Sequence, residues 1–148
     1  MKKALALFGM ILFLFACSKK EEGMQIPLAD EYITWDFRGG QGMIISPRDT
    51  LATVRIGTQT ELGGMTPDGR NYFMVLFNGD RQPGTYNTAN FNFKLDTITY
   101  RLGNAPMQVF ISRYEGVGGY VQGNYSATLK DRDSLDYPIR GAFRIRSR

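Results

Sequence analysis

The chain has 148 residues, enough for one domain of ordinary size, and its 14 acidic and 18 basic residues nearly balance. It contains no histidine, which excludes a serine–histidine–aspartate triad and the usual histidine zinc site. Removing Lys2 and Lys3, which belong to the leader described next, lowers the formal net charge from +4 to about +2, so the charge does not indicate a nucleic-acid partner.

The first segment has the pattern of a secretory signal peptide. A basic start is followed by Ala4–Ala16, which is apolar apart from Gly9 and too short for a comfortable membrane crossing of ~20 residues. Leu14-Phe15-Ala16-Cys17 resembles the bacterial lipobox, in which the cysteine thiol carries a diacylglyceryl group. We therefore predict a signal peptide over residues 1–16 and lipidation of Cys17; a retained membrane anchor is the alternative.

Cys17 is the only cysteine, so the mature chain has no internal disulfide. The hydrophobic core must therefore stabilise the fold without disulfide bonds. Several acyl chains on one amino terminus give stable anchoring where a single chain is marginal. The sequence predicts a lipidated tether over residues 17–29 and a single β domain over residues 30–148.

The residues after Cys17 bear on localisation. Ser18 stands where an aspartate would retain a lipoprotein in the inner membrane, which favours an outer-membrane address. The next charges resemble the surface-export signal of Bacteroidota lipoproteins, at Lys20, Glu21 and Glu22. A solvated tether is the alternative, so a cell-surface and a periplasm-facing position both stay open.

The domain shows strand periodicity throughout. Ile33, Trp35 and Phe37 alternate with polar residues, and the same alternation recurs over 91–95, 98–102 and 107–112. Turn clusters such as Gly39-Gly40-Gln41-Gly42 separate these segments. Short strands with regular turns predict an all-β fold, namely an antiparallel β-sandwich.

A lipocalin-like β-barrel is the alternative fold. Lipocalin-type barrels place a tryptophan on the first strand and cover it with an arginine from the last. Trp35 lies early and Arg144 and Arg146 lie late, but Ile33 occupies the position where such barrels carry glycine. Trp35 is expected in the core in either fold.

The last third carries the most distinctive pattern, in which a glycine, one spacer and an aromatic residue occur on two strands. The pairs are Gly123 with Tyr125 and Gly141 with Phe143, preceded by Pro83-Gly84-Thr85-Tyr86. This combination resembles a family of Bacteroidota lipoprotein domains with a PGTY turn and a closing β-hairpin. The resemblance implies structural roles and carries over no catalytic residue, so we predict that these four residues belong to the core.

No catalytic constellation is evident, so we predict that the protein is not an enzyme and needs no cofactor. Two carboxylates would suffice for glycoside hydrolysis, but nothing in the sequence pairs the available Asp36, Asp80, Asp96 and Glu115. Asp131, Asp133 and Asp136 raise the question of calcium. Leu135 stands where an EF-hand loop needs an oxygen ligand, so we predict a solvated hairpin turn and no metal site.

The final strand predicts a basic face. Arg140, Arg144 and Arg146 alternate with apolar residues, and they would form a ligand surface for acidic glycans or headgroups together with Tyr100, Tyr114 and Tyr120. A charged sheet edge that prevents aggregation is the alternative. The leading functional hypothesis is a non-catalytic binding module, anchored to the outer membrane by its lipid, for glycan or other envelope material. The second is an accessory lipoprotein that docks to another envelope protein.

Overall fold

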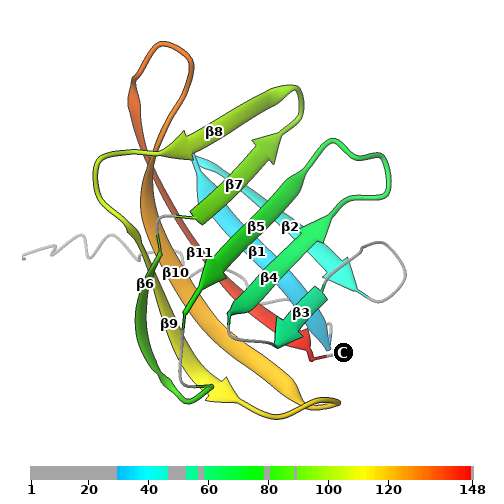
Figure 1. Ribbon diagram of the computed structural model, residues 1–148. Coiled ribbons are helices and arrows are strands. Elements are labelled where there is room, and N and C mark those ends of the chain that lie inside the picture. Colours follow the sequence, from blue (N-terminus) through cyan, green and yellow to red (C-terminus); the bar gives the residue numbers. More distant parts are fainter. Residues whose placement is uncertain (1–29, 47–52, 57–58, 79–80, 89, 148) are drawn as a thin grey trace, which may run out of the picture.

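The computed structural model describes residues 30–46, 53–56, 59–78, 81–88 and 90–147 (Figure 1). The predicted signal peptide, tether and sites at Cys17, Lys20, Glu21 and Glu22 lie outside these residues, so they stay predictions. The described parts contain strands and no helix. The strands are β1 (Glu31–Phe37), β2 (Gly40–Ser46), β3 (Thr53–Ile56), β4 (Thr60–Met65), β5 (Tyr72–Phe77), β6 (Gly84–Thr88), β7 (Asn90–Leu95), β8 (Ile98–Leu102), β9 (Met107–Tyr114), β10 (Tyr120–Lys130) and β11 (Asp136–Arg146).

The strands form one antiparallel sheet that curves round and nearly closes into a barrel (Figure 1). Its main path runs β2-β1-β11-β10-β8-β7-β5-β4-β3. The long strand β10 forks the sheet, because it pairs with β9 over Val121–Ser126 and with β8 at Leu129 and Lys130. Strand β6 pairs with the far side of β9. The prediction of an all-β antiparallel fold is confirmed.

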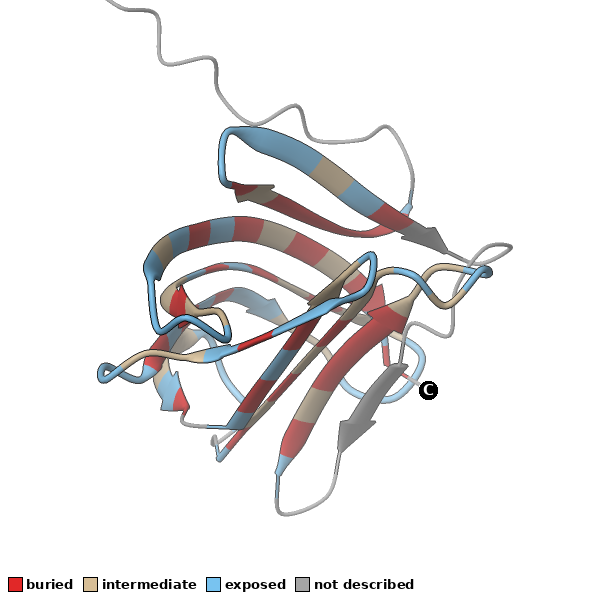
Figure 2. Ribbon diagram, turned by 90° about the horizontal axis from the view of Figure 1, so that it is seen from above, coloured by how far each residue is buried: buried red, intermediate tan, exposed pale blue. Residues whose placement is uncertain are grey.

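The core lies between the walls of this curved sheet and is rich in aromatic rings. The alternation predicted for β1 is confirmed, because Ile33, Trp35 and Phe37 all point inward and are buried. From the opposite wall, Phe93 meets the Trp35 ring edge-on at 5.7 Å and Tyr100 meets Phe37 at 4.7 Å. Each large side chain buried in this way contributes roughly 1.5–3 kcal/mol. Alternating buried and exposed bands along the strands follow from this arrangement (Figure 2).

The glycine–aromatic pattern near the carboxyl terminus is part of the core, as predicted. In the β10–β11 ladder, Gly123 lies opposite Phe143 and Tyr125 lies opposite Gly141. Each aromatic ring therefore covers the glycine of the neighbouring strand: the Phe143 ring lies 3.0 Å from where a Gly123 Cβ would be. Both rings are buried. The two glycines leave the space that these rings fill.

Glycine-rich segments form more strand than the sequence indicates. The predicted turn at residues 39–42 is confined to Arg38 and Gly39, both with positive φ, and β2 begins at Gly40. Gly42 pairs with Trp35, and a side chain there would collide with the indole ring. The predicted PGTY turn likewise continues as β6 from Gly84. At Gly42 the missing side chain makes room for the indole ring of Trp35.

Strand β11 lies inside the sheet, between β1 and β10. The interpretation of its arginines as guards of a sheet edge is therefore wrong. The lipocalin-type pairing is also absent from the described residues. Arg144 lies opposite Tyr32, whereas Trp35 shares the inner face with Ile33, so the arginine and the indole are on opposite sides of the sheet.

Candidate functional site

The predicted arginine face of β11 exists on the outside of the sheet, but its charges are largely engaged. Arg140 pairs with Asp36, its cross-strand neighbour, with 3.1 Å between Nη2 and Oδ2. Such an exposed ion pair contributes only ~0–1 kcal/mol to the stability of the fold. It nevertheless uses guanidinium N–H donors of Arg140 that a ligand would need. Arg140 is therefore less available to an acidic ligand than the sequence indicates.

The other two arginines enclose one tyrosine. Arg144 and Arg146 lie 4.3 and 4.8 Å from the centre of the Tyr120 ring, and Arg146 Nη2 donates to Tyr120 Oη at 2.7 Å. Arg144 was expected to face water but is half-buried, and its Nε has no hydrogen-bond partner among the described residues. Both cations are therefore engaged with the ring, although Arg146 stays exposed.

The three tyrosines of the predicted ligand surface do not gather. Tyr100 is 2% exposed and belongs to the core, because it shares the inward face of β8. Its hydroxyl accepts a hydrogen bond from Arg38 Nη1 at 3.3 Å. The Tyr114 hydroxyl is 2.7 Å from Thr60 Oγ1 on β4. Of the three tyrosines, only Tyr120 accompanies the arginines, and Tyr100 is too deeply buried to line a ligand surface.

The carboxylates considered for hydrolysis lie in separate places. Asp36 faces Arg140, Glu115 faces Arg113, and Asp96 is 3.9 Å from Arg70. Asp80 lies outside the described residues. Within the part of the chain that is described, no three histidine, cysteine or acidic side chains are grouped as a metal site.

The acidic segment after β10 forms the predicted hairpin turn. Asp131 Oδ1 accepts hydrogen bonds from the N–H groups of Asp133 and Leu135 at 2.9 and 3.2 Å. Ser134 adopts a positive φ of 61°, which closes the turn. Partial desolvation raises the pKa of Asp131, but hydrogen bonds from backbone N–H groups and from the Tyr137 hydroxyl outweigh it and hold the pKa below its ordinary value.

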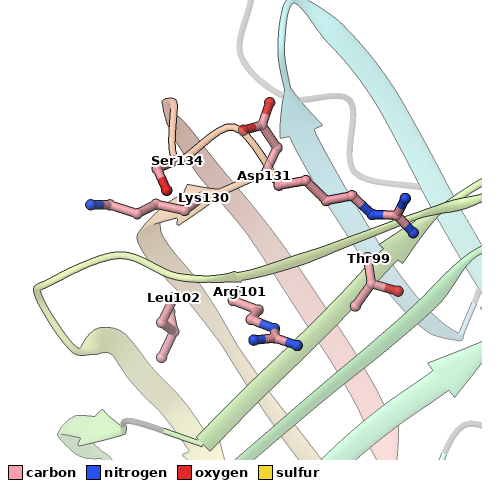
Figure 3. A pocket seen from close by; sticks show the side chains of 7 residues that line it. Thr99, Arg101, Leu102, Lys130, Asp131 and Ser134 are labelled. Carbon is pink, nitrogen blue, oxygen red and sulfur yellow. The ribbon is translucent and has the colours of Figure 1, made fainter.

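A basic pocket lies beside this turn and is the strongest candidate site (Figure 3). Arg101 of β8 forms one side, and Lys130 and Ser134 of the β10–β11 hairpin form the other (Figure 3). Its volume is about 680 Å³, within the range of about 300–1,000 Å³ typical of ligand sites. The lining residues are Thr99, Arg101, Leu102, Lys130, Asp131, Arg132 and Ser134.

The charges of the basic pocket are poorly compensated. Arg101 and Lys130 are directly opposite in the β8–β10 ladder, an arrangement in which like charges repel. Lys130 approaches Asp136 at 3.8 Å, a distance that gives only a weak pair. The side chains of Arg101 and Arg132 have no hydrogen bond or ion pair with any described residue. The Asp131 carboxylate is held by its own turn. The pocket therefore presents two free guanidinium groups to solvent.

Other hollows of the surface lack this character. One is lined by neutral amides and hydroxyls, including Asn78, Asn87 and Asn90, together with Phe77. Another contains the paired Asp36 and Arg140. A third hollow adjoins the basic pocket and shares Arg132 with it, but Asp131 and Asp133 also line that hollow. Of these hollows, the basic pocket is the one lined by two arginines without side-chain partners among the described residues.

The sequence analysis missed the basic pocket for a physical reason. Arg101 and Lys130 meet only through a pairing between strands far apart in the chain, and no local pattern specifies that register. For Tyr100 the signal was present: it alternates with Thr99 and Arg101, which places it on the inward face.

Comparisons with protein-family models, with curated proteins and with solved structures find no match. The resemblance to Bacteroidota lipoprotein domains accordingly stays a prediction. No helix among the residues described is long and apolar enough to span a membrane.

Proposed function

We propose that this chain is a non-catalytic binding module of the bacterial envelope, anchored to the outer membrane through a lipid on Cys17, with acidic glycan or other anionic envelope material as its ligand. The observation that carries the proposal is the basic pocket, in which Arg101 and Arg132 have no partner among the described residues. Free guanidinium groups in a concave site favour an anionic ligand, because they bind oxyanions through paired N–H donors.

The absence of a reactive arrangement supports binding rather than catalysis. The chain has no histidine to act as general base. Asp36 and Glu115 each face an arginine rather than a second carboxylate. Anchoring is supported by the lipobox-like residues before Cys17, and surface display by the charges at Lys20, Glu21 and Glu22.

No observation favours the second hypothesis, docking to an envelope protein. Docking surfaces are contiguous apolar patches of more than a few hundred Å². The exposed large apolar residues of the described chain are instead scattered over β2, β8, β9 and two turns. They are Met43, Ile98, Phe110, Val117 and Leu135.

The experiment compares polysaccharides that differ only in charge. The full-length mature protein in detergent is titrated with dextran sulfate and with neutral dextran of equal length. We expect binding to the sulfated polymer alone, weakening as salt rises, because screening acts over about 10 Å at 0.1 M. Equal binding to both polymers, or binding to neither, would contradict an anion-binding function.

A further inference from the structure

The β10–β11 turn, which lines the basic pocket, and the start of β1 at Glu31 lie at opposite ends of the sheet (Figure 1). We call the end at Glu31, where the predicted tether joins the domain, the tether pole. The chain enters the sheet at Glu31, whose carboxylate accepts a hydrogen bond from the Arg146 N–H at 3.1 Å, so the start of β1 and the end of β11 are adjacent. At the other end of the same strands, Phe37 pairs with Ile139. The pocket turn lies beyond that pair, between β10 and β11.

The separation of the two poles follows from strand length. Strand β11 has 11 residues, from Asp136 at the pocket turn to Arg146 at the tether pole. At a rise of about 3.3 Å per residue, its ends are roughly 33 Å apart. This distance is several Debye lengths at ordinary salt, about 8–10 Å. A membrane next to the tether pole would therefore exert little electrostatic influence on the pocket.

The chemistry of the basic pocket specifies an oxyanion. Arg101 lies on β8 and Arg132 in the turn, so the two planar guanidinium groups approach the pocket from separate elements. A carboxylate, sulfate or phosphate accepts paired hydrogen bonds from a guanidinium group. Such a group would also relieve the repulsion between Arg101 and Lys130. The hydrogen bonds from Asp133 and Leu135 to Asp131 hold the turn that carries Arg132.

We infer that Arg101 and Arg132 bind an oxyanion group of a free acidic glycan, which approaches from the end of the domain opposite Glu31. This inference rests on the proposed function and adds the binding residues, the recognised group and the direction of approach. Headgroups of the anchoring membrane share the oxyanion chemistry, and the second experiment below separates the two sources.

The first experiment measures the affinity of the full-length protein for a galacturonate oligosaccharide by calorimetry. The test variant is Arg101→Gln with Arg132→Gln. The control is Arg70→Gln with Arg140→Gln, which removes the same charge from two exposed arginines paired with carboxylates. We expect at least about tenfold weaker binding in the test variant, as for lost hydrogen bonds to charged groups. The control should stay within about twofold of the wild type.

Thermal denaturation without oligosaccharide gives an independent readout. Because Arg101→Gln removes a like-charge pair with Lys130, the test variant should melt at the same temperature as the wild type or higher. Loss of affinity with an unchanged fold would assign the site. If the wild type binds and the test variant binds equally well, the pocket assignment is wrong while the proposed function stands. If the control loses affinity instead, the site includes Arg70 or Arg140 and not the basic pocket.

The second experiment tests the direction of approach. The lipidated full-length protein is reconstituted into vesicles of phosphatidylcholine alone or with phosphatidylglycerol, and oligosaccharide affinity is measured at the same salt concentration. Because the pocket is remote from the tether pole, the affinity should agree within about twofold. A severalfold loss in the anionic vesicles would show that headgroups occupy the pocket, which overturns the inferred direction. No binding of the oligosaccharide in any format would overturn the inference, whereas the dextran sulfate titration decides the proposed function.

Discussion

A close backbone approach between β1 and β11 determines which residues can occupy positions 34, 125 and 141. The Tyr125 hydroxyl donates to the Thr34 carbonyl oxygen at 2.8 Å, and burial raises the pKa of this tyrosine well above its ordinary value. The Thr34 hydroxyl donates to the Ala142 carbonyl at 3.1 Å and accepts from its N–H at 3.2 Å. Gly141 lies between these groups, where a Cβ would collide with the Thr34 oxygen and the Tyr125 ring.

Gly141→Ala should therefore destabilise the domain strongly. The obstructing atoms include backbone, which cannot rotate away, so the cost is expected at or above the 1–3 kcal/mol typical of overpacking. Gly116→Ala is the matched control, because a Cβ there meets nothing within 4 Å. It should change stability by less than about 1 kcal/mol. Urea denaturation of the two variants measures the difference, and similar midpoints would show that the approach at Gly141 is not tight.

At the scale of elements, three hairpin turns are stabilised in the same way, by a carboxylate that accepts hydrogen bonds from N–H groups of its own turn. Asp68 accepts from Thr66 Oγ1 and the Arg70 N–H in the β4–β5 turn. Glu115 accepts from the Tyr120 N–H at 2.6 Å in the β9–β10 turn. Asp131 does the same between β10 and β11. In all three the pKa lies below its ordinary value: the Thr66 hydroxyl is the main cause for Asp68, and the Tyr120 N–H for Glu115.

These turns predict loss of stability in acid. A carboxyl whose pKa is lower in the folded than in the unfolded chain contributes stability above its unfolded pKa, and this is lost as pH falls through the folded value. Stability should therefore fall below about pH 4, the ordinary range of these groups. Glu115→Gln should be less stable at pH 7 and respond less to acid, whereas Glu61→Gln, on strand β4, should follow the wild type. Urea melts between pH 3 and 7 test this; wild-type stability that rises in acid would contradict it.

The sequence predicts those elements whose signal is local. Alternation placed Ile33, Trp35 and Phe37 of β1 and Met107, Val109 and Ile111 of β9 on the inner face, where all are buried. Strand β4 was missed because Gly63 and Gly64 resemble a turn. Gly64 instead packs where its Cβ would lie 2.9 Å from Ile33 Cδ1, a contact between distant strands. The environment of such residues depends on the pairing register between strands that are not adjacent in the sequence. The same holds for the pairing of Arg101 with Lys130.

At the scale of the whole molecule, the fork in the sheet places the candidate site. Strand β10 exchanges β9 for β8 as its neighbour after Ser126, and the Gly103 N–H donates to the Thr128 carbonyl at 2.7 Å where the chain leaves β8. The basic pocket lies at this junction. In the proposed function, a lipid on Cys17 anchors the domain that carries this pocket.

Cys17→Ser should abolish anchoring and leave the fold intact. The hydroxyl cannot carry a thioether-linked diacylglyceryl group, so the acyl chains that would hold the mature protein in the membrane are not added. We expect an uncleaved precursor that incorporates no labelled palmitate and is missing from the outer-membrane fraction. Ser18→Ala, one residue away, should keep both the label and the location. Because the β domain begins about a dozen residues later, at Glu31, its urea midpoint should not change. A serine variant that is still cleaved and still recovered with the outer membrane would refute lipid anchoring at Cys17. The β domain itself would then have to contact the membrane.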